Sequence, residues 1–237
     1  MNHHPAQLEC LKPREIFERV RQAPIAWLPL GAIEWHGWHA PVGLDSHTAH
    51  GLCLRAAERA GGVVLPPVWS GLTGSIAAHP WTILEEDDTV LLTWLRRCLT
   101  RLEQQGIKRA LVVSGHFALT QTKALQSLQA EWDAELHTLA LSCQTVADCP
   151  NLLVPPDHGG AFETALLQSL HPQLVDLTQL DESTGDRPEE EPGGIQRRNP
   201  SHPLFGIIGA DPRDIPQDLP QKLEEQLVSW LCDLARD

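Results

Sequence analysis

The sequence from Ile25 to Asp45 reads IAWLPLGAIEWHGWHAPVGLD, and it joins an apolar run to a set of polar side chains. The run Ile25–Leu30 is uniformly apolar, which predicts a buried strand of a parallel sheet. Glu34, His36 and Asp45 follow it directly. Carboxylate oxygens and imidazole nitrogens together suit a divalent metal ion, and a metal there can generate hydroxide from water at neutral pH. This stretch therefore favours a metallohydrolase.

Apolar runs and helical patterns alternate along the rest of the chain. Strands are predicted at 25–30, 63–68, 109–113 and 135–142. Helices are predicted at about 47–60, 88–105, 119–132, 162–170 and 220–235. This alternation predicts an α/β fold in which helices cover both faces of a mainly parallel sheet. Residues 1–237 are expected to form a single domain, in which the segment 181–203, rich in Pro, Gly and charge, is a long loop that serves as a lid or a partner contact.

The composition argues against several classes of protein. The 237 residues are 42% hydrophobic and 21% charged, as in an ordinary soluble domain. The formal net charge of −13 disfavours nucleic-acid binding, which needs a basic face. No apolar run approaches the roughly 20 residues of a membrane helix, and the first residues lack the pattern of a secretory signal. The six cysteines form no Cys-x-x-Cys pair, so we expect no structural zinc knuckle. They are scattered through apolar segments, so we expect reduced thiols and a cytoplasmic location.

Polar side chains with metal-binding chemistry follow three of the predicted strands. In an open parallel sheet, ligands bind at the carboxyl ends of the strands, so these residues are expected to meet at one edge. Glu34 and His36 are two residues apart, and such residues point to the same side of an extended segment. The full set of candidate metal ligands is Glu34, His36, Asp45, His116 and Glu163, with His158 beside them.

Four of these six residues also have an interpretation that needs no metal. Asp45 precedes a predicted helix and could cap it. His116 could be a hydrogen-bonded turn residue, and Glu163 could be stabilised by the dipole of its helix alone. His158 precedes two glycines and could be a ligand, a general acid or a plain loop residue. The joint placement of the set at one edge favours the metal site, and His39 is a candidate to support one of the ligands.

Four motifs between residues 28 and about 212 resemble those of the creatininase (creatinine amidohydrolase) family. The family's Gly-Ser-x-Glu-Gln-His-Gly-x-His-x-Pro-x-x-x-Asp appears as Gly31-Ala-Ile-Glu-Trp-His-Gly-Trp-His-Ala-Pro-Val-Gly-Leu-Asp45. Its His-Ala-Gly-x-x-Glu-Thr appears as His158-Gly-Gly-Ala-Phe-Glu-Thr164. Two matches are less complete: Asn-Gly-His-Gly-Gly-Asn appears as Ser114-Gly-His-Phe-Ala-Leu119, and Gly-x-x-Gly-Asp-Pro as Gly206-Ile-Ile-Gly-Ala-Asp-Pro212 with one inserted residue.

The resemblance implies a three-layer α/β/α sandwich and a binuclear centre that holds two divalent ions, Zn, Mn or Fe. It also implies a homo-oligomer, often a hexamer, and a small-molecule substrate, a cyclic or linear amide whose C–N bond is hydrolysed by metal-bound hydroxide. Carried over by position, the ligands form two pairs that share one bridge: Glu34 with His116, His36 with Glu163, and Asp45 between them.

The pocket departs from the family pattern. In creatininase itself a ligand Glu occupies the position of Ala118, which cannot bind a metal, so a related amidase is expected here. Trp35 and Trp38 replace Gln and a small residue or Pro in the first motif, and Trp81 replaces Gly in His79-Pro-Trp-Thr82, which resembles the family's Phe-Pro-Gly-Thr element. These tryptophans are expected to narrow the pocket or stack on a planar substrate. His158 is expected to protonate the leaving nitrogen.

Three other functions remain open. The altered turn Ser114–Leu119 suits a family member that binds a ligand or partner without turnover. Peptide processing, another activity in the family, would need an open groove under the loop 181–203. A nucleotide-binding flavodoxin-like protein is the weakest alternative, because no Gly-x-Gly-x-x-Gly or phosphate loop follows a strand.

Overall fold

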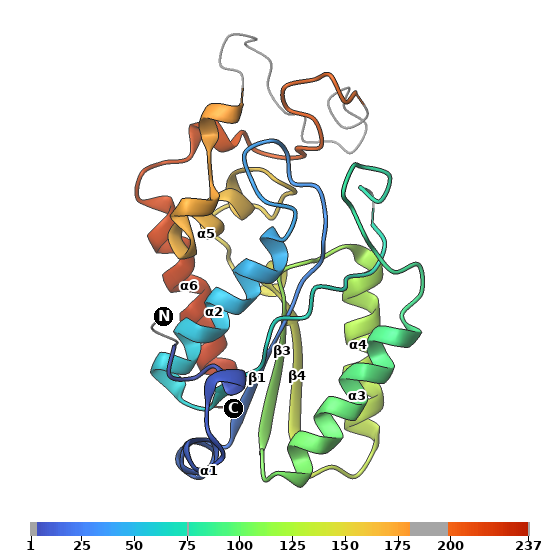
Figure 1. The fold of residues 1–237 in the computed structure, drawn as a ribbon, viewed down its shortest axis with the longest axis vertical. Coiled ribbons are helices and arrows are strands. Elements are labelled where there is room, and N and C mark those ends of the chain that lie inside the picture. The colour runs from blue at the N-terminus through green and yellow to red at the C-terminus, as the bar shows by residue number, and fades with distance from the viewer. Residues whose placement is uncertain (1–3, 75, 181–198, 237) are drawn as a thin grey trace.

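The central sheet positions the candidate site. The computed structural model describes residues 4–74, 76–180 and 199–236, and within them four parallel strands pair in the order β2-β1-β3-β4 (Figure 1). The strands are β1 (Ile25–Leu30), β2 (Val63–Val64), β3 (Arg109–Ser114) and β4 (Ala140–Thr145). β1 and β3 pair from Ile25 opposite Arg109 to Leu30 opposite Ser114, so both strands end at the same edge. Residues 181–198 of the predicted loop lie outside the described residues.

Helices cover both faces of this sheet (Figure 1). One layer contains α2 (Leu44–Ala60), α5 (Ala161–Leu170) and α6 (Leu219–Leu234), and the other contains α3 (Thr89–Gln104) and α4 (Leu119–Ala134). Alternate residues of each strand point to opposite faces of the sheet and pack against different helical layers. Trp27, Leu111 and Val113 pack against the first layer, and Leu28, Leu30 and Val112 pack against the second. Each fully buried side chain of this size contributes about 1.5–3 kcal/mol of stability. The predicted three-layer α/β/α sandwich is confirmed.

The second strand is shorter than predicted because Pro66 and Pro67 have no backbone N–H to donate to a neighbouring strand. Regular pairing stops at Val64, and Val68 resumes it as an isolated bridge. The Val68 N–H donates to the Pro29 carbonyl at 3.0 Å, and the Val68 carbonyl accepts the N–H of Gly31 at 2.9 Å.

The fourth strand begins at Ala140, five residues later than predicted. The backbone N–H groups of Thr138 and Leu139 donate to the Glu103 carboxylate on α3, which holds the preceding segment away from the sheet. Pairing starts where the Ala140 N–H reaches the Lys108 carbonyl at 2.8 Å.

Helix α1 (Pro13–Gln22) is an addition to the predicted elements. Pro13 in its first turn, and the Glu15 carboxylate that accepts the Lys12 N–H at 2.6 Å, are the sequence signals that identify such a helix. Short 3-10 helices lie at Leu8–Cys10, Val146–Asp148, Pro172–Leu174, Leu177–Gln179 and Pro212–Asp214. None of the helices in the described ranges is long and apolar enough to span a bilayer.

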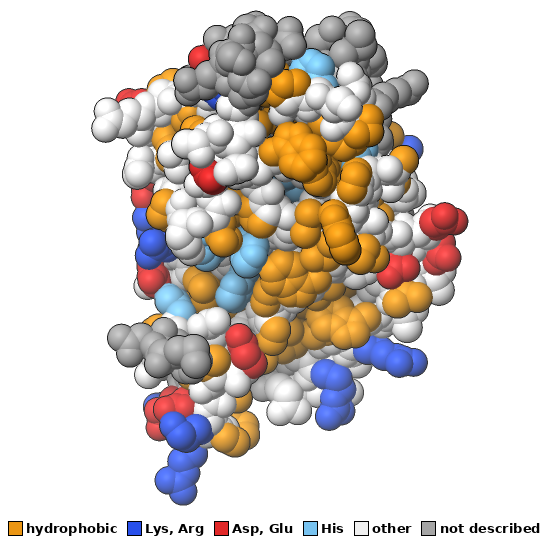
Figure 2. Space-filling model, turned by 45° about the horizontal axis from the view of Figure 1, so that its top comes forward, with side chains coloured by type: hydrophobic (Ala, Val, Ile, Leu, Met, Phe, Trp, Pro, Cys, Tyr) orange, Lys and Arg blue, Asp and Glu red, His pale blue; other side chains and the backbone are white. Residues whose placement is uncertain are grey.

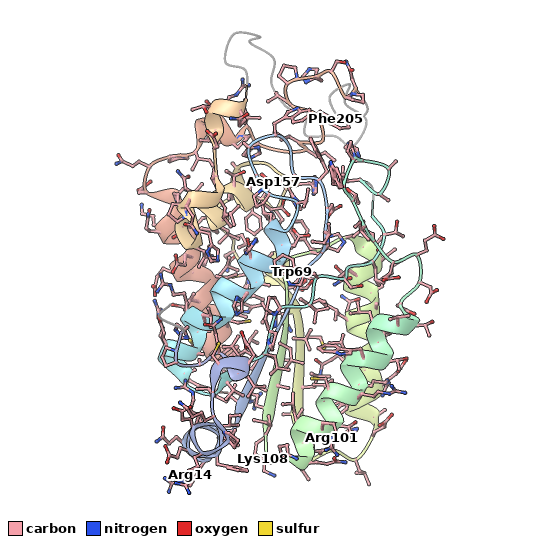
Figure 3. The ribbon with its side chains drawn as sticks, in the orientation of Figure 1. Arg14, Trp69, Arg101, Lys108, Asp157 and Phe205 are labelled. Atoms are coloured by element: carbon pink, nitrogen blue, oxygen red, sulfur yellow. The ribbon has the colours of Figure 1, made fainter. Side chains whose placement is uncertain are left out.

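Two glycines let α2 approach the ends of β1 and β3. A Cβ on Gly115 would lie 2.1 Å from the carbonyl oxygen of Asp45, and one on Gly31 would lie 2.2 Å from the backbone nitrogen of Ser46. Only a residue without a side chain fits at either position. The first turn of α2 is therefore packed directly against the strand ends, at the same end of the molecule as Asp157 and opposite Lys108 (Figure 3).

Candidate metal centre

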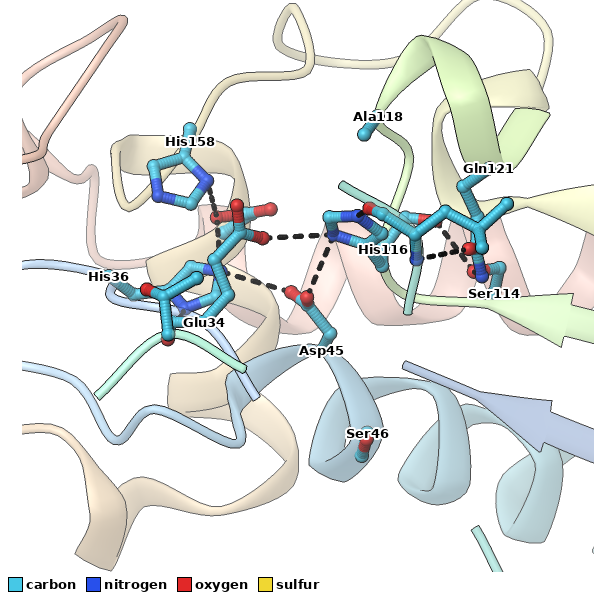
Figure 4. Close-up of polar contacts among 12 residues, drawn as sticks. Glu34, His36, Asp45, Ser46, Ser114, His116, Ala118, Gln121 and His158 are labelled. Atoms are coloured by element: carbon cyan, nitrogen blue, oxygen red, sulfur yellow. Dashed lines mark hydrogen bonds and ion pairs between the residues drawn. The ribbon is translucent and has the colours of Figure 1, made fainter. Parts of the chain in front are cut away.

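Three carboxylates and two imidazoles meet at the carboxyl end of the sheet (Figure 4). They come from the loop after β1, the first turn of α2, the turn between β3 and α4, and the first turn of α5. Each is less than 5% exposed; the five are Glu34, His36, Asp45, His116 and Glu163. The structure thus brings together all five residues that the sequence singles out as candidate metal ligands.

The five residues form two groups that share Asp45. In the first, Nδ1 of His116 lies 2.9 Å from Oε2 of Glu34 and 3.2 Å from Oδ2 of Asp45. In the second, Nε2 of His36 lies 3.0 Å from Oδ1 of Asp45 and 3.4 Å from Oε2 of Glu163. Within each group one ligand atom per residue lies within 4.8 Å of the others, so each group could hold a metal ion. Glu34, His36 and His158 satisfy the same criterion as a third group, which overlaps both.

Backbone carbonyls fix which nitrogen of each imidazole faces the group. His36 Nδ1 donates to the Glu34 carbonyl at 2.8 Å, and His116 Nε2 donates to the Leu72 carbonyl at 2.9 Å. His158 follows the same pattern, because its Nε2 donates to the Trp35 carbonyl at 2.6 Å. The second nitrogen of each ring faces the carboxylates, and without its proton it has the lone pair that a metal-binding histidine uses.

The buried polar atoms of His36 and Asp45 are better placed to bind a metal ion than to hydrogen-bond to each other. His36 Nε2 and both Asp45 oxygens are inaccessible to solvent and have no hydrogen-bond partner within the described parts of the chain. Nε2 and Oδ1 are nevertheless only 3.0 Å apart, so they lie close without the alignment of a hydrogen bond. A buried polar atom without a partner costs about 1–3 kcal/mol, a cost that a cation bound by both residues would remove.

The charges in the group act strongly on one another. Burial disfavours the imidazolium of His36, but Asp45 and Glu163 outweigh burial and raise its pKa to about 10. Burial also disfavours the imidazolium of His116, but the adjacent carboxylates of Asp45 and Glu34 outweigh burial and raise its pKa well above the ordinary value. Burial raises the pKa of the Glu163 carboxyl. The pocket thus attracts positive charge, which divalent cations would supply.

The first turn of α5 is held by Asp157, which sequence reasoning does not single out. Its Oδ2 accepts the Phe162 N–H at 3.0 Å and its Oδ1 accepts the Glu163 N–H at 3.4 Å, so Asp157 caps the helix that carries Glu163. The Glu163 side chain in turn accepts the Gly159 N–H at 2.6 Å. A carboxylate a few residues before a predicted helix is the signal that could have found it.

Two alternatives from the sequence can be compared with the geometry. Asp45 is not the cap of α2, because the helix begins at Leu44 and Gly43 precedes it. His39 lies outside the ligand groups, and its Nε2 contacts the Thr164 hydroxyl at 2.8 Å, one residue from Glu163. His39 therefore contacts the helix turn that carries Glu163 and not a ligand itself, and its supporting role stays a prediction.

A cavity of about 360 Å³ opens beside the ligand set. Its lining residues are Glu34, Thr73, Gly74, Ile76, His116, Phe117, Ala118, Leu119, Thr120, His158 and Glu163. Burial, opposed by the negative charge of Glu34, lowers the pKa of His158 to about 4, so its imidazole is neutral near pH 7. His158 Nδ1 lies 4.0 Å from Oε2 of Glu163, so His158 reaches both the ligands and the cavity.

The three tryptophans proposed to bind substrate do not line this cavity as described. Trp35 is buried, its Nε1–H donates to the Phe205 carbonyl at 2.8 Å, and its ring meets that of Trp38 edge-on at 4.7 Å. Trp38 and Trp81 are 49% and 77% exposed. Apolar side chains gather on one face of the molecule (Figure 2). A contact between these rings and a substrate stays a prediction.

Comparison with known proteins gives the family. The family model of creatininase, described as creatinine amidohydrolase, matches residues 10–235. The chain belongs to the creatininase family. The creatinine amidohydrolase of Pseudomonas putida is 28% identical over 177 residues, which cover 66% of this chain and 68% of that protein. The predicted resemblance is therefore confirmed, and the chain is an amidohydrolase, a hydrolase of C–N bonds other than peptide bonds.

Solved structures of creatininase share the fold. A mutant creatininase described as Zn-Zn type has a TM-score of 0.77 at 22% identity, and a form described as creatininase Mn has 0.74 at 23%. Each match covers 98% of this chain and 97% of the other. The agreement extends along almost the whole creatininase fold.

Proposed function

We propose that this chain is a binuclear metal-dependent amidohydrolase that hydrolyses a C–N bond of a small cyclic or linear amide. The single observation that carries the proposal is the position of Asp45 between the two ligand groups. Its Oδ1 faces His36 and its Oδ2 faces His116, so one carboxylate can serve two ions. Three carboxylates in the group nearly balance the charge of two divalent cations.

Glu34 and His116 would hold one ion and His36 and Glu163 the other, with Asp45 shared. Divalent ions in such a site lower the pKa of water and polarise a carbonyl oxygen. Zinc, manganese and iron all accept this donor set of carboxylate oxygens and imidazole nitrogens. The buried walls around the ligands exclude bulk water, which strengthens every electrostatic interaction within the site.

His158 is the proposed proton carrier. Its Nε2–H is occupied by the Trp35 carbonyl, which leaves Nδ1 as the atom that can take up and release a proton. Nδ1 lies on the ligand side, 4.0 Å from Glu163, where a proton from the attacking water can be accepted and then passed to the leaving nitrogen.

The cavity beside the ligands favours a neutral substrate. Its described lining has no Lys or Arg to bind a carboxylate or phosphate. Ile76, Phe117 and Leu119 offer apolar contacts instead, and Gly74 lies beside Oε1 of Glu34. These contacts support a compact, uncharged amide of the kind that fits about 360 Å³.

Metal analysis and an amide panel test the proposal together. The purified protein is expected to hold up to two equivalents of Zn, Mn or Fe, and Glu34→Gln is expected to lose metal while the exposed control Glu86→Gln retains it. His158→Gln is expected to retain metal and lose turnover. The panel contains creatinine, other five- and six-membered cyclic amides, and their linear counterparts.

The outcomes separate the alternatives. A protein without metal, or a Glu34→Gln variant that binds metal as the wild type does, would contradict the metal centre. Full metal content with no hydrolysis of any amide in the panel would instead favour a family member that binds a ligand without turnover.

A further inference from the structure

A buried chain of hydrogen bonds outside the ligand groups holds His116 from two sides (Figure 4). Gln121 and Ser114 are fully buried, and His116 is 4% exposed. Ser114 is the last residue of β3, and Gln121 lies in the first turn of α4. Neither belongs to a ligand group, yet both are connected to His116.

The first side of the chain acts on the imidazole ring. The Leu72 carbonyl accepts the Nε2–H of His116 at 2.9 Å, and the Leu72 N–H donates to Oε1 of Gln121 at 3.0 Å. Leu72 lies between β2 and α3, 44 residues before His116. Gln121 therefore holds the loop residue whose carbonyl determines which nitrogen of His116 is protonated.

The second side acts on the backbone of His116. Nε2 of Gln121 donates to Oγ of Ser114 at 3.3 Å, and the Ser114 hydroxyl donates to the His116 carbonyl at 2.6 Å. One carboxamide thus links the Leu72 loop to the end of β3. Buried networks of this kind fix a geometry when every member has a partner.

We propose that Gln121 and Ser114 are positioning residues, which act through Leu72 and through the His116 backbone to keep Nδ1 of His116 facing Glu34 and Asp45. The inference rests on the proposed function, because it takes His116 as a ligand. Without Gln121, the buried Leu72 N–H loses its acceptor, and the loop is free to move the carbonyl away from Nε2. The ring then loses its preferred orientation, and the metal affinity at His116 falls.

Zinc titration in two single-site backgrounds tests this positioning. Gln121→Met keeps the side-chain length and removes both hydrogen bonds. It is combined with His36→Ala, which leaves the Glu34–Asp45–His116 group, and separately with His116→Ala, which leaves the His36–Asp45–Glu163 group and the overlapping Glu34–His36–His158 group. Metal-stripped proteins are titrated with Zn²⁺ in competition with a chromogenic chelator. Gln121→Met is expected to weaken zinc binding about 10- to 100-fold in the first background. In the second, the affinity is expected to stay within about twofold, as for an independent site.

A second variant with a smaller expected effect and a control variant complete the test. Ser114→Ala is expected to weaken the same group to a smaller extent, and it carries the test if Gln121→Met does not fold. The double variant Gln121→Met/Ser114→Ala is expected to lose little more than Gln121→Met, because both changes break one chain of contacts. Gln126→Met, an exposed change on the same helix, is expected to have no effect.

Different results would contradict the positioning role and the metal centre. Equal loss of zinc affinity in both backgrounds, or no loss in either, would overturn the positioning role and leave the metal centre standing. Parent proteins that bind no zinc would overturn the metal centre, and the positioning role with it.

Discussion

The Asp45 carboxylate lies between two imidazoles, with Oδ1 3.0 Å from Nε2 of His36 and Oδ2 3.2 Å from Nδ1 of His116. Asp45 is fully buried, and the carbonyl oxygen of its own backbone lies against Gly115. Its position depends on α2 and on the end of β3 together. This one side chain connects the two ligand groups, which makes it the most informative residue to change.

Asp45→Asn is expected to reduce zinc binding in both groups, because the amide keeps the shape of the carboxylate but removes the charge that two cations share. Glu163→Gln is expected to reduce zinc binding only in the group of His36, Asp45 and Glu163. Zinc per chain, measured after dialysis against a fixed free-zinc concentration, distinguishes the two variants. An Asp45→Asn protein that keeps two tightly held equivalents would argue against the shared ligand.

Gly115→Ala is expected to destabilise the fold and lower metal content, because the new Cβ would lie 2.1 Å from the Asp45 carbonyl oxygen. Gly106→Ala is the matched control. Gly106 has a φ of +88°, but its Cβ would meet nothing within 4 Å, so only backbone strain of about 1–2 kcal/mol is expected. Urea unfolding of both variants measures the difference. Equal losses of stability would show that the contact with α2 has no special role.

Gln129→Ala is expected to expose the free edge of β4. The Gln129 carboxamide accepts the Cys143 N–H at 2.9 Å and donates to the Leu141 carbonyl at 2.8 Å, as a neighbouring strand would. Removing the Gln129 carboxamide should lower the free energy of unfolding by about 1–3 kcal/mol. It should also promote association of two protein molecules through the exposed edges of β4. Light scattering across a concentration series and urea unfolding measure the two effects, with Gln126→Ala as the control. A variant that associates no more than this control would show that Gln129 does not protect the edge.

Glu103→Gln is expected to remove a pH-dependent part of the stability. Bonds from His137 and the Thr138 backbone lower the pKa of Glu103 from 4.5 to about 2. Because the folded pKa is the lower one, this stabilisation is complete above about pH 4.5 and disappears as the pH falls toward 2. Burial opposes the charged form of His137, but Glu103 and Glu135 outweigh it and raise the pKa of His137. The stability that depends on the positive charge of His137 is therefore lost at alkaline pH.

Melting temperatures of the wild type and Glu103→Gln at about pH 2.5, 5.5 and 9 test this expectation. The difference in melting temperature between the wild type and Glu103→Gln should be largest at about pH 5.5. A gap that stays constant down to the lowest pH would mean that the Glu103 carboxylate does not hold the loop before β4.

The strands show what apolar patterns can and cannot predict. β1 was predicted to the residue, and β3 to within one residue, because strands buried between two helical layers are apolar along their length. β4 was predicted five residues too early. The segment before it is held by Glu103, which lies 35 residues away from Thr138. A contact of that kind leaves no mark on the local pattern.

The candidate ligands were predictable for a different reason. Carboxylates and imidazoles that follow parallel strands must reach the same edge of the sheet, and the five predicted residues do meet there. Their action as ligands, the proton transfer by His158 and the substrate contacts of Trp35, Trp38 and Trp81 stay predictions, which the experiments above address. The supporting residues Asp157 and Gln121 were not predicted, because a buried side chain that bonds to distant backbone looks like any other polar residue in the sequence.

The sequence by itself determined the alternation of strands and helices from β1 onward and the chemical groups that gather at one edge of the sheet. The tertiary structure decided which atom of each group faces the centre. His116 presents Nδ1 because the carbonyl of Leu72, 44 residues earlier, accepts a hydrogen bond from Nε2–H, and Gln121 holds Leu72 in place. A buried imidazole takes its orientation from the hydrogen-bond partner that the folded chain brings to it, and that partner comes from a distant segment.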